Sequence, residues 1–227
     1  MSMGETAENI AENYDLSREQ QDGFAVEAQK SGRLKNEIIQ IGTKSGKIYK
    51  DGCIRTDTTK ETLDDLKPAF SETRSVIAGT SSPLTDGASA VLVTTEEFAK
   101  KNGLEPLARI KSFAVSGCKP EIMGIGPVNS SQKAMRRTGI TADDLDVIEL
   151  NEAFSSQSLA VIQDLKLDIT RINIDGGALA LVHPLGATGA RITGKAAQIL
   201  RRDGGRYASS TQCIGGGQGI VTVLEAA

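Results

Sequence analysis

The chain has 227 residues, of which 39% are hydrophobic and 24% are charged, and its formal net charge is −3. This length suits one or two domains with a sizeable core, and the charge balance argues against binding to nucleic acid or an anionic membrane. The sequence holds no apolar run near the roughly 20 residues of a membrane span, and its polar, acidic N-terminus is unlike a signal peptide. We therefore expect an intracellular protein of the cytoplasm or an organelle matrix.

The three cysteines, Cys53, Cys118 and Cys213, lie far apart in the chain and form no Cys-x-x-Cys pair. This pattern suits neither a disulfide framework nor a zinc site. We expect free thiols, no metal site and no bound cofactor.

The first half of the chain predicts helices at its start and irregular structure after them. Helices are expected over 6–14 and, from the capping box Ser17-Arg-Glu-Gln20, to about residue 30. Both are expected to be solvated. A strand-like stretch covers 37–49 with a turn at 44–47, and 53–70 is typical of an irregular connection. Strands are predicted at 88–94 and 107–115, with a short helix at 95–102 between them.

The second half alternates helices and strands. Helices are predicted at 128–138, 152–165 and 190–202, and strands at 146–150, 171–174, 207–213 and 219–224. A further capping signal, Thr141-Ala-Asp-Asp144, precedes the first of these strands. Alternation of this kind predicts an α/β layered fold whose apolar strands are covered by helices on both faces.

His183 is the only histidine of the chain, so it is the obvious candidate for proton transfer near neutral pH. It lies in the glycine-rich segment 175–191, is followed by Pro184, and precedes a predicted helix. The N-terminus of a helix favours negative charge through its free N–H groups and its dipole. The alternative is a structural histidine in a tight turn.

Three loops follow successive predicted strands and contain Asn151, His183 and Cys213. Ligands of open α/β sheets bind beyond the carboxyl ends of the strands, so these loops could converge on one site. An amide and an imidazole can stabilise an oxyanion, and a thiol can move protons or attack carbon. The alternatives are a helix cap for Asn151, a buried small hydrophobe for Cys213, and a plain hairpin turn for the glycines after it. The glycine run is not a phosphate-binding loop, because its Lys-Ser/Thr is missing.

Together these motifs resemble the thiolase family. The resemblance rests on Asn-Glu-Ala-Phe at 151–154, His-Pro-Leu-Gly-Ala-Thr-Gly-Ala-Arg at 183–191 and Cys-Ile-Gly-Gly-Gly-Gln-Gly at 213–219. Further matches cover most of the chain, at Met3-Gly4, 6–9, 66–70, 82–88 and 123–127. The chain is thus identified as a member of this family, which implies an α/β/α/β/α layered enzyme.

The resemblance implies an acyltransferase that interconverts a 3-ketoacyl-CoA plus CoA with an acyl-CoA plus acetyl-CoA. It assigns His183 and Asn151 to one oxyanion hole, Asn151 through a water, and the N–H of Gly215 to a second. It makes Cys213 the acid/base, with a thiol beside His183 and glycine N–H groups rather than in apolar packing. The residues that match the CoA groove and the acyl and pantetheine ends are Met3, Arg55, Phe70, Ala78, Ser82, Met123 and Phe154.

The sequence also departs from the family pattern. Cys53 and Cys118 match no nucleophilic cysteine, so the resemblance implies a C-terminal half that lacks the nucleophile and is inactive alone. It would be either a truncated product or fragment, or one chain of a split enzyme whose partner supplies the nucleophile. We expect 1–84 to be part of the CoA-binding loop domain, 85–105 a remnant of the N-terminal domain whose strand exposes an edge, and 106–227 the C-terminal domain.

The sequence differs from the family pattern at three further places. The segment 28–33 is short, Ile77 stands where threonine is common, and Val182 replaces a glycine, which is unfavourable if the backbone there needs a positive φ.

Two other interpretations stay open. One is a non-catalytic thiolase-like module that binds CoA esters or a partner subunit, and the other is a nucleotide-binding α/β domain, which rests on glycine loops alone. If the chain is part of a thiolase, we expect CoA thioesters as substrates, an N-terminal thiolase half or another subunit as partner, and a homo- or hetero-oligomer.

Overall fold

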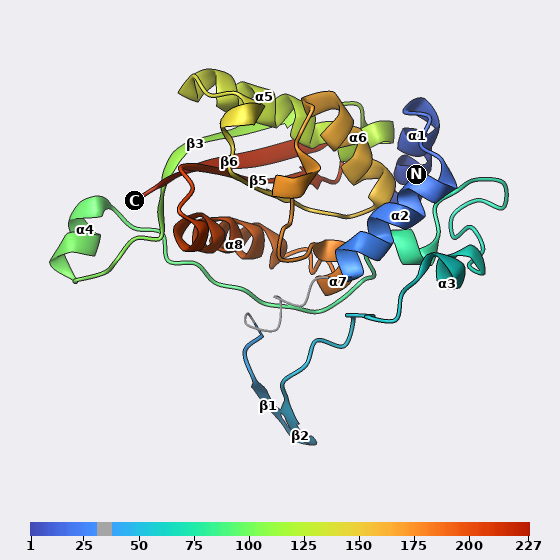
Figure 1. Ribbon diagram of the computed structural model, residues 1–227, viewed down its shortest axis with the longest axis horizontal. Helices are drawn as coiled ribbons and strands as arrows, with labels where there is room; N and C mark the ends of the chain where they lie inside the picture. The colour runs from blue at the N-terminus through green and yellow to red at the C-terminus, as the bar shows by residue number, and fades with distance from the viewer. Residues whose placement is uncertain (31–37) are drawn as a thin grey trace.

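The computed structural model describes residues 1–30 and 38–227 and is built around one four-stranded sheet (Figure 1). The strand order is β3-β6-β5-β4, with β4 parallel to β5 and the other neighbours antiparallel. Their bounds are Ala108–Gly117 for β3, Val147–Leu150 for β4, Tyr207–Ile214 for β5 and Gln218–Ala226 for β6. The expected strands at 107–115, 146–150, 207–213 and 219–224 are thus confirmed.

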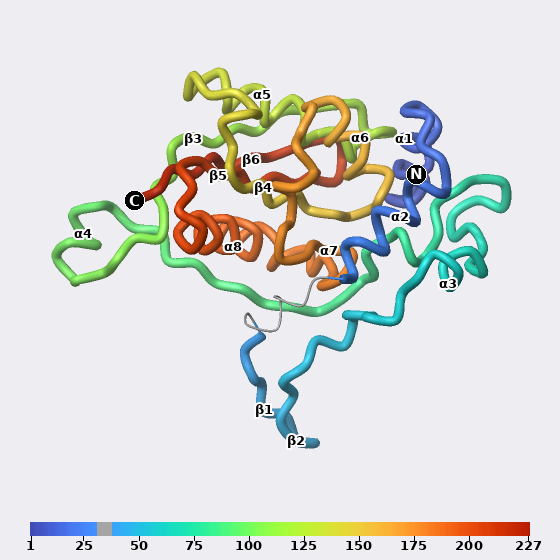
Figure 2. The backbone as a smooth tube through the Cα atoms, viewed as in Figure 1, coloured from blue at the N-terminus to red at the C-terminus, as the bar shows by residue number. Residues whose placement is uncertain are grey.

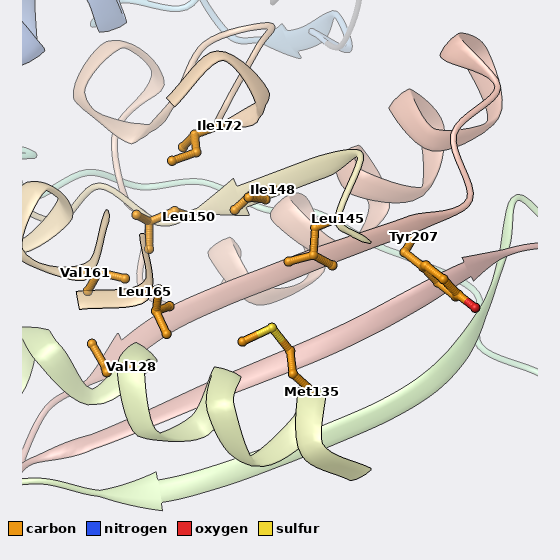
Figure 3. Close-up of a cluster of buried hydrophobic side chains, with 9 residues drawn as sticks. All are labelled: Val128, Met135, Leu145, Ile148, Leu150, Val161, Leu165, Ile172 and Tyr207. Carbon is orange, nitrogen blue, oxygen red and sulfur yellow. The ribbon is translucent and has the colours of Figure 1, made fainter. Parts of the chain in front are cut away.

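Helices cover both faces of this sheet, as the apolar strands predict. On one face, α5 (Gly126–Thr138) and α6 (Ser155–Leu165) enclose a core that Figure 3 shows, with Val128, Val161 and Leu165 facing Ile148 and Leu150. On the other face, α8 (Thr188–Asp203) packs Ala196, Ile199 and Leu200 against the sheet. The α/β fold is confirmed, and its body consists of the four-stranded sheet between helical layers.

The two N-terminal helices are α1 (Met3–Asn13) and α2 (Arg18–Gln29), each opened by a capping box, at Ser2 and Ser17. They are less solvated than the sequence suggested. Ile10 of α1 packs against Ala160 of α6 in a buried cluster, and the Ser156 hydroxyl donates to the Ala7 carbonyl. Helix α2 contacts α6 as well, so both helices lie on the side of the molecule where the candidate site is found.

Beyond α2 the chain forms a hairpin that projects from the body of the molecule (Figure 2). The strands β1 (Ile41–Thr43) and β2 (Gly46–Ile48) pair only with each other, and their residues are exposed. The strand-like stretch predicted over 37–49 is thus a short hairpin, and residue 37 and the second half of 28–33 lie outside the described residues. The connection at 53–70 is irregular as expected apart from α3 (Lys60–Asp64).

The strand predicted at 88–94 is wrong. Residues 82–94 run extended along the α8 side of the molecule and join no strand among the described residues, so no sheet hydrogen bonds form. Leu92 and Val93 are 74% and 68% exposed. The Ser89 hydroxyl, which donates to the Ala187 carbonyl, anchors this segment beside the histidine loop. The short helix after it, α4 (Glu96–Lys101), is confirmed.

The strand predicted at 171–174 is also wrong. The 3-10 helix η5 (Ile169–Arg171) occupies its start, and only Ile172 forms an isolated parallel bridge, to Ile148. Side chains instead make the link to the sheet, as described below for Asn173. The remaining short helices are η2 (Ala78–Thr80), η3 (Pro120–Ile125), η4 (Ala142–Asp144) and α7 (Ala178–Leu181).

A buried carboxylate fixes the segment between η5 and the histidine loop. Asp175 is 1% exposed and forms ion pairs of 2.6 Å with Lys195 and with Arg202 of α8. Burial by itself would raise the pKa of Asp175, but the hydrogen bonds and charges of Arg202 and Lys195 outweigh it and hold the pKa at about 2. Within the described residues, no helix is long and apolar enough to cross a membrane.

Candidate active site

Asn151 follows the last residue of β4 and lies against the end of β5. Its backbone N–H donates to the Thr211 carbonyl at 2.9 Å, which extends the β4–β5 pairing by one residue. The side chain is fully buried, and neither of its amide atoms has a hydrogen-bond partner within the described part of the chain. It does not cap the following helix, because α6 begins after Phe154, so the helix-cap alternative is wrong. A buried, unsatisfied amide is costly and suits a site where a ligand or water binds.

Cys213 lies near the end of β5, two residues beyond Thr211. It is 7% exposed and packs in an apolar cluster with Val76, Met123 and Phe154. The expectation of a thiol outside apolar packing is therefore wrong. Burial raises the pKa of Cys213 to about 12, against a smaller lowering by a backbone hydrogen bond, so the thiol stays protonated at neutral pH.

The glycines after Cys213 make the tight β5–β6 turn. Gly216 and Gly217 have φ values of 86° and 92°, which side chains rarely adopt, and a Cβ on Gly217 would lie 2.5 Å from the Cys118 carbonyl oxygen. Gly215 is exposed and has no atom near an added Cβ. Its backbone is thus open to a ligand at the carboxyl end of β5.

His183 is half-buried between α7 and α8. Its Nδ1 lies 2.6 Å from the Oγ1 of Thr188, the first residue of α8. Burial lowers the pKa of His183, and the positive charge of Arg191 lowers it further, so the neutral ring predominates at physiological pH. The histidine loop does lead into a helix N-terminus, as predicted.

Val182, immediately before the histidine, has φ 77° and ψ 172°. This combination belongs to a region that glycine occupies almost alone and that costs other residues about 1–3 kcal/mol. The side chain is 3% exposed, so the surrounding packing holds it in place. The positive φ that would make valine unfavourable here is therefore present.

A buried carboxylate, which sequence reasoning missed, joins the Asn151 loop to the histidine loop. Glu152 accepts hydrogen bonds from the Leu179 N–H of α7 at 3.0 Å and from Asn173 Nδ2 at 2.5 Å. Asn173 also bonds both backbone polar groups of Leu150. Burial raises the pKa of Glu152, with these hydrogen bonds opposing it. Gly177 makes room for the carboxylate, since an added Cβ would lie 2.1 Å from it.

Most residues assigned to the CoA groove gather around Phe154. The rings of Phe70 and Phe154 meet edge to face with centroids 6.0 Å apart, and Ser82 donates its backbone N–H to the Ala153 carbonyl. Met123 is in the same cluster as Cys213, and Gly4, next to Met3, lies against the Phe70 ring. These aromatic and apolar groups can form the wall of a groove for an acyl or pantetheine chain.

Two predicted residues lie apart from this cluster. Ala78 is exposed at the start of η2, and the exposed Arg55 donates its backbone N–H to the Gln29 side chain. In the described structure no hydrogen bond joins His183 directly to Asn151 or Cys213. Asn151 and Cys213 thus lie at the ends of the neighbouring strands β4 and β5, and Glu152 links the Asn151 loop to the histidine loop. No group of residues suited to a metal ion is found in the described ranges.

The sequence could not easily have revealed Thr188 and Glu152. Both stand inside the quoted motifs, but only their contacts with His183 and Leu179 give them a role. Neither role has a sequence signal of its own, because the burial of Glu152 and its contact with Leu179 depend on segments far apart in the chain.

Comparison with known proteins agrees with the motifs. Residues 104–226 match the family model of the thiolase C-terminal domain, and residues 1–97 match that of the thiolase N-terminal domain. The chain thus contains sequence of both domains, more than the C-terminal half that the motifs led us to expect.

Individual relatives of the chain are also thiolases. The chain is 48% identical to a 3-ketoacyl-CoA thiolase of Marinobacter nauticus and 44% identical to an acetyl-CoA acetyltransferase of Paracoccus denitrificans, covering 98% of this chain and 61% and 60% of theirs. It superposes on human mitochondrial 3-ketoacyl-CoA thiolase in complex with CoA with a TM-score of 0.96 and 43% identity, covering 100% of this chain and 59% of that one. The chain therefore spans about 60% of the length of the relatives it matches.

Proposed function

Because this chain belongs to the thiolase family, we propose that it supplies the oxyanion-binding and proton-transferring part of a thiolase active site. The reaction is the reversible conversion of a 3-ketoacyl-CoA plus CoA into an acyl-CoA plus acetyl-CoA. The observation that carries the proposal is Asn151: a fully buried amide without a hydrogen-bond partner in the described structure, at the end of the strand that pairs with the strand of Cys213. Such a group stabilises a bound oxygen far more than an exposed amide does, since little water competes with it.

Each proposed catalytic residue has a role that its surroundings support. Asn151, through a water, and His183 bind the oxygen of one thioester, and the N–H of Gly215 binds that of the other. Cys213 gives a proton to a carbanion or to the sulfur of CoA. Its raised pKa supports this role as an acid, because the thiol is fully protonated before the reaction.

The substrates in this proposal are CoA thioesters. The Phe70–Phe154 pair, Met123 and the neighbouring Met3 form an apolar wall for the acyl and pantetheine groups. Ser82 and Ala78 lie on the adjoining segment, and Arg55 would reach the phosphates. No cofactor has a place in the reaction, since CoA itself carries the acyl group.

A nucleophilic cysteine completes the chemistry, and neither Cys53 nor Cys118 matches the family's nucleophile. Cys118 contacts the Met123 carbonyl, and burial raises the pKa of both thiols. We infer that an N-terminal thiolase half contributes the nucleophile, within a homo- or hetero-oligomer. Residues 1–84 then belong to the CoA-binding loop domain, 85–105 to the N-terminal domain and 106–227 to the C-terminal domain.

Several relatives carry the word mitochondrial in their names. Their similarity supports an organelle matrix, one of the two proposed locations, over the cytoplasm.

The test is thiolysis of acetoacetyl-CoA by the purified chain alone and by the chain co-expressed with a thiolase N-terminal half. We expect no turnover and no acyl-enzyme by mass spectrometry for the chain alone, and turnover for the pair. In the pair, Asn151→Ala should lower kcat by about 100- to 1,000-fold, the usual loss for an oxyanion donor.

The control variant is Asn129→Ala, which removes the amide that donates to the Gly117 carbonyl from the exposed side of α5. It should leave kcat unchanged. Turnover by the chain alone, or equal kcat for the two variants, would overturn the proposal.

A further inference from the structure

Thr188 is the one side chain that the described structure hydrogen-bonds to the His183 ring. Its Oγ1 lies 2.6 Å from His183 Nδ1 and 3.0 Å from the carbonyl oxygen of Pro184. The Thr188 side chain is fully buried, so these two contacts are formed away from bulk water. A hydroxyl has one proton, so it can donate a hydrogen bond to only one of these two partners.

The Pro184 carbonyl indicates which partner receives the Thr188 proton. A carbonyl oxygen only accepts hydrogen bonds, so the 3.0 Å contact, beside the bonds that the same carbonyl accepts from the N–H groups of Ala187 and Thr188, is a hydrogen bond only when the Thr188 proton lies between the two oxygens. If Oγ1 donated to Nδ1 instead, two acceptor oxygens would face each other at 3.0 Å with no proton between them, at a threonine whose side chain is fully buried. Oγ1 therefore accepts from Nδ1, which must carry a proton.

We propose that Thr188 is a positioning residue that fixes the neutral His183 ring as the Nδ1–H tautomer and leaves Nε2 as a lone-pair acceptor for the substrate site. A neutral imidazole carries a single proton, so a proton on Nδ1 leaves Nε2 unprotonated. A histidine held in this way cannot donate a hydrogen bond from Nε2 until the ring takes up a second proton.

This inference rests on the proposed function in one respect, the reacting partner of Nε2. In that reaction His183 first accepts a proton from a thiol, whose S–H bond breaks as the Nε2–H bond forms and a thiolate remains. Only the resulting imidazolium donates to a thioester oxygen. The lowered pKa that burial and Arg191 impose on His183 agrees with a ring that starts neutral.

The single histidine makes the test direct, because histidine labelled with ¹⁵N gives the ring signals of His183 alone. Couplings between the ring nitrogens and the ring carbon-bound protons identify which nitrogen is protonated. At about pH 8, where the ring is neutral, the wild-type chain should show the Nδ1–H tautomer. The measurement needs neither substrate nor turnover, so it remains informative even if the proposed function fails.

Variants separate positioning from simple packing. Thr188→Val keeps the shape but removes the acceptor, so the ring should shift towards the Nε2–H tautomer that free histidine prefers, and the pKa of His183 should fall further because the charged ring loses a hydrogen bond. Thr188→Ser keeps the hydroxyl and should restore the wild-type tautomer.

The matched control is Thr193→Val, which removes a hydroxyl from the same helix at a contact with Ser210. It should leave the His183 signals unchanged. An Nε2–H tautomer in the wild type, or an Nδ1–H tautomer that persists in Thr188→Val, would overturn the proposal. If Thr188→Val fails to fold, the wild-type spectrum and Thr188→Ser still decide it.

Discussion

The strain at Val182 makes a prediction that reverses an ordinary rule of protein stability. At most positions with negative φ, replacing alanine by glycine destabilises the protein by about 0.5–1 kcal/mol, because glycine loses more backbone freedom on folding. Val182 has φ 77° and ψ 172°, where a Cβ costs about 1–3 kcal/mol. We therefore expect Val182→Gly to be more stable than Val182→Ala by about 1 kcal/mol.

Alanine is the right reference because valine contributes burial as well as strain. The Val182 side chain is 3% exposed, and removing its two methyl groups costs roughly 2 kcal/mol whatever the backbone does. In Val182→Gly compared with wild type, this loss and the relieved strain oppose each other. The step from alanine to glycine removes only Cβ and isolates the backbone contribution.

Urea unfolding of the two variants measures the difference, and a thermal scan should show Val182→Gly melting about 2–4 °C above Val182→Ala. The same pair of substitutions at Val147 of β4 is the control, since that side chain is also 3% exposed and its backbone is an ordinary strand. There alanine should be the more stable variant. If glycine were the less stable residue at both positions, the strain argument would be refuted.

Three further predictions concern buried groups. Asp175, with a pKa of about 2, is depressed below its unfolded value, so it stabilises the fold above about pH 4 by roughly 2 kcal/mol and loses this as the pH falls towards 2. Asp175→Asn should abolish that part of the pH dependence in unfolding experiments, and an unchanged profile would contradict it. In the folded chain, Cys213 should react with iodoacetamide more slowly than half-buried Cys118, because burial raises the pKa of Cys213 to about 12. In denaturant the two thiols should react equally fast. If peptide mapping finds Cys213 modified first in the folded chain, the thiol is accessible and the argument is wrong. Gly177→Ala should destabilise the chain by about 1–3 kcal/mol, the cost of a clash in the core, because the added Cβ meets the Glu152 carboxylate. The control is Gly186→Ala, which has open space around it and should leave the melting temperature unchanged. Equal melting temperatures for the two variants would exclude the clash.

The sequence by itself determined the elements whose signals are local. The capping box at Ser17 set the start of α2, and apolar periodicity located α5 and the strands of the sheet, because a helix start or a buried strand depends on residues close in the chain. The motifs around Asn151, His183 and Cys213 were sufficient to identify the family, and the replacement of a glycine by Val182 correctly marked a strained position.

Only the tertiary structure decided what these residues contact. The segments 88–94 and 171–174 are apolar enough for strands, but a strand exists only where a partner supplies its hydrogen bonds, and the described structure offers none to the first and a single bridge to the second. Burial of Cys213 among Val76 and Phe154 depends on segments far apart in sequence, as does the carboxylate link from Glu152 to Leu179. The protonation of a site follows from such contacts, because desolvation and hydrogen bonding set a pKa and a tautomer, and neither can be read from neighbours in the chain.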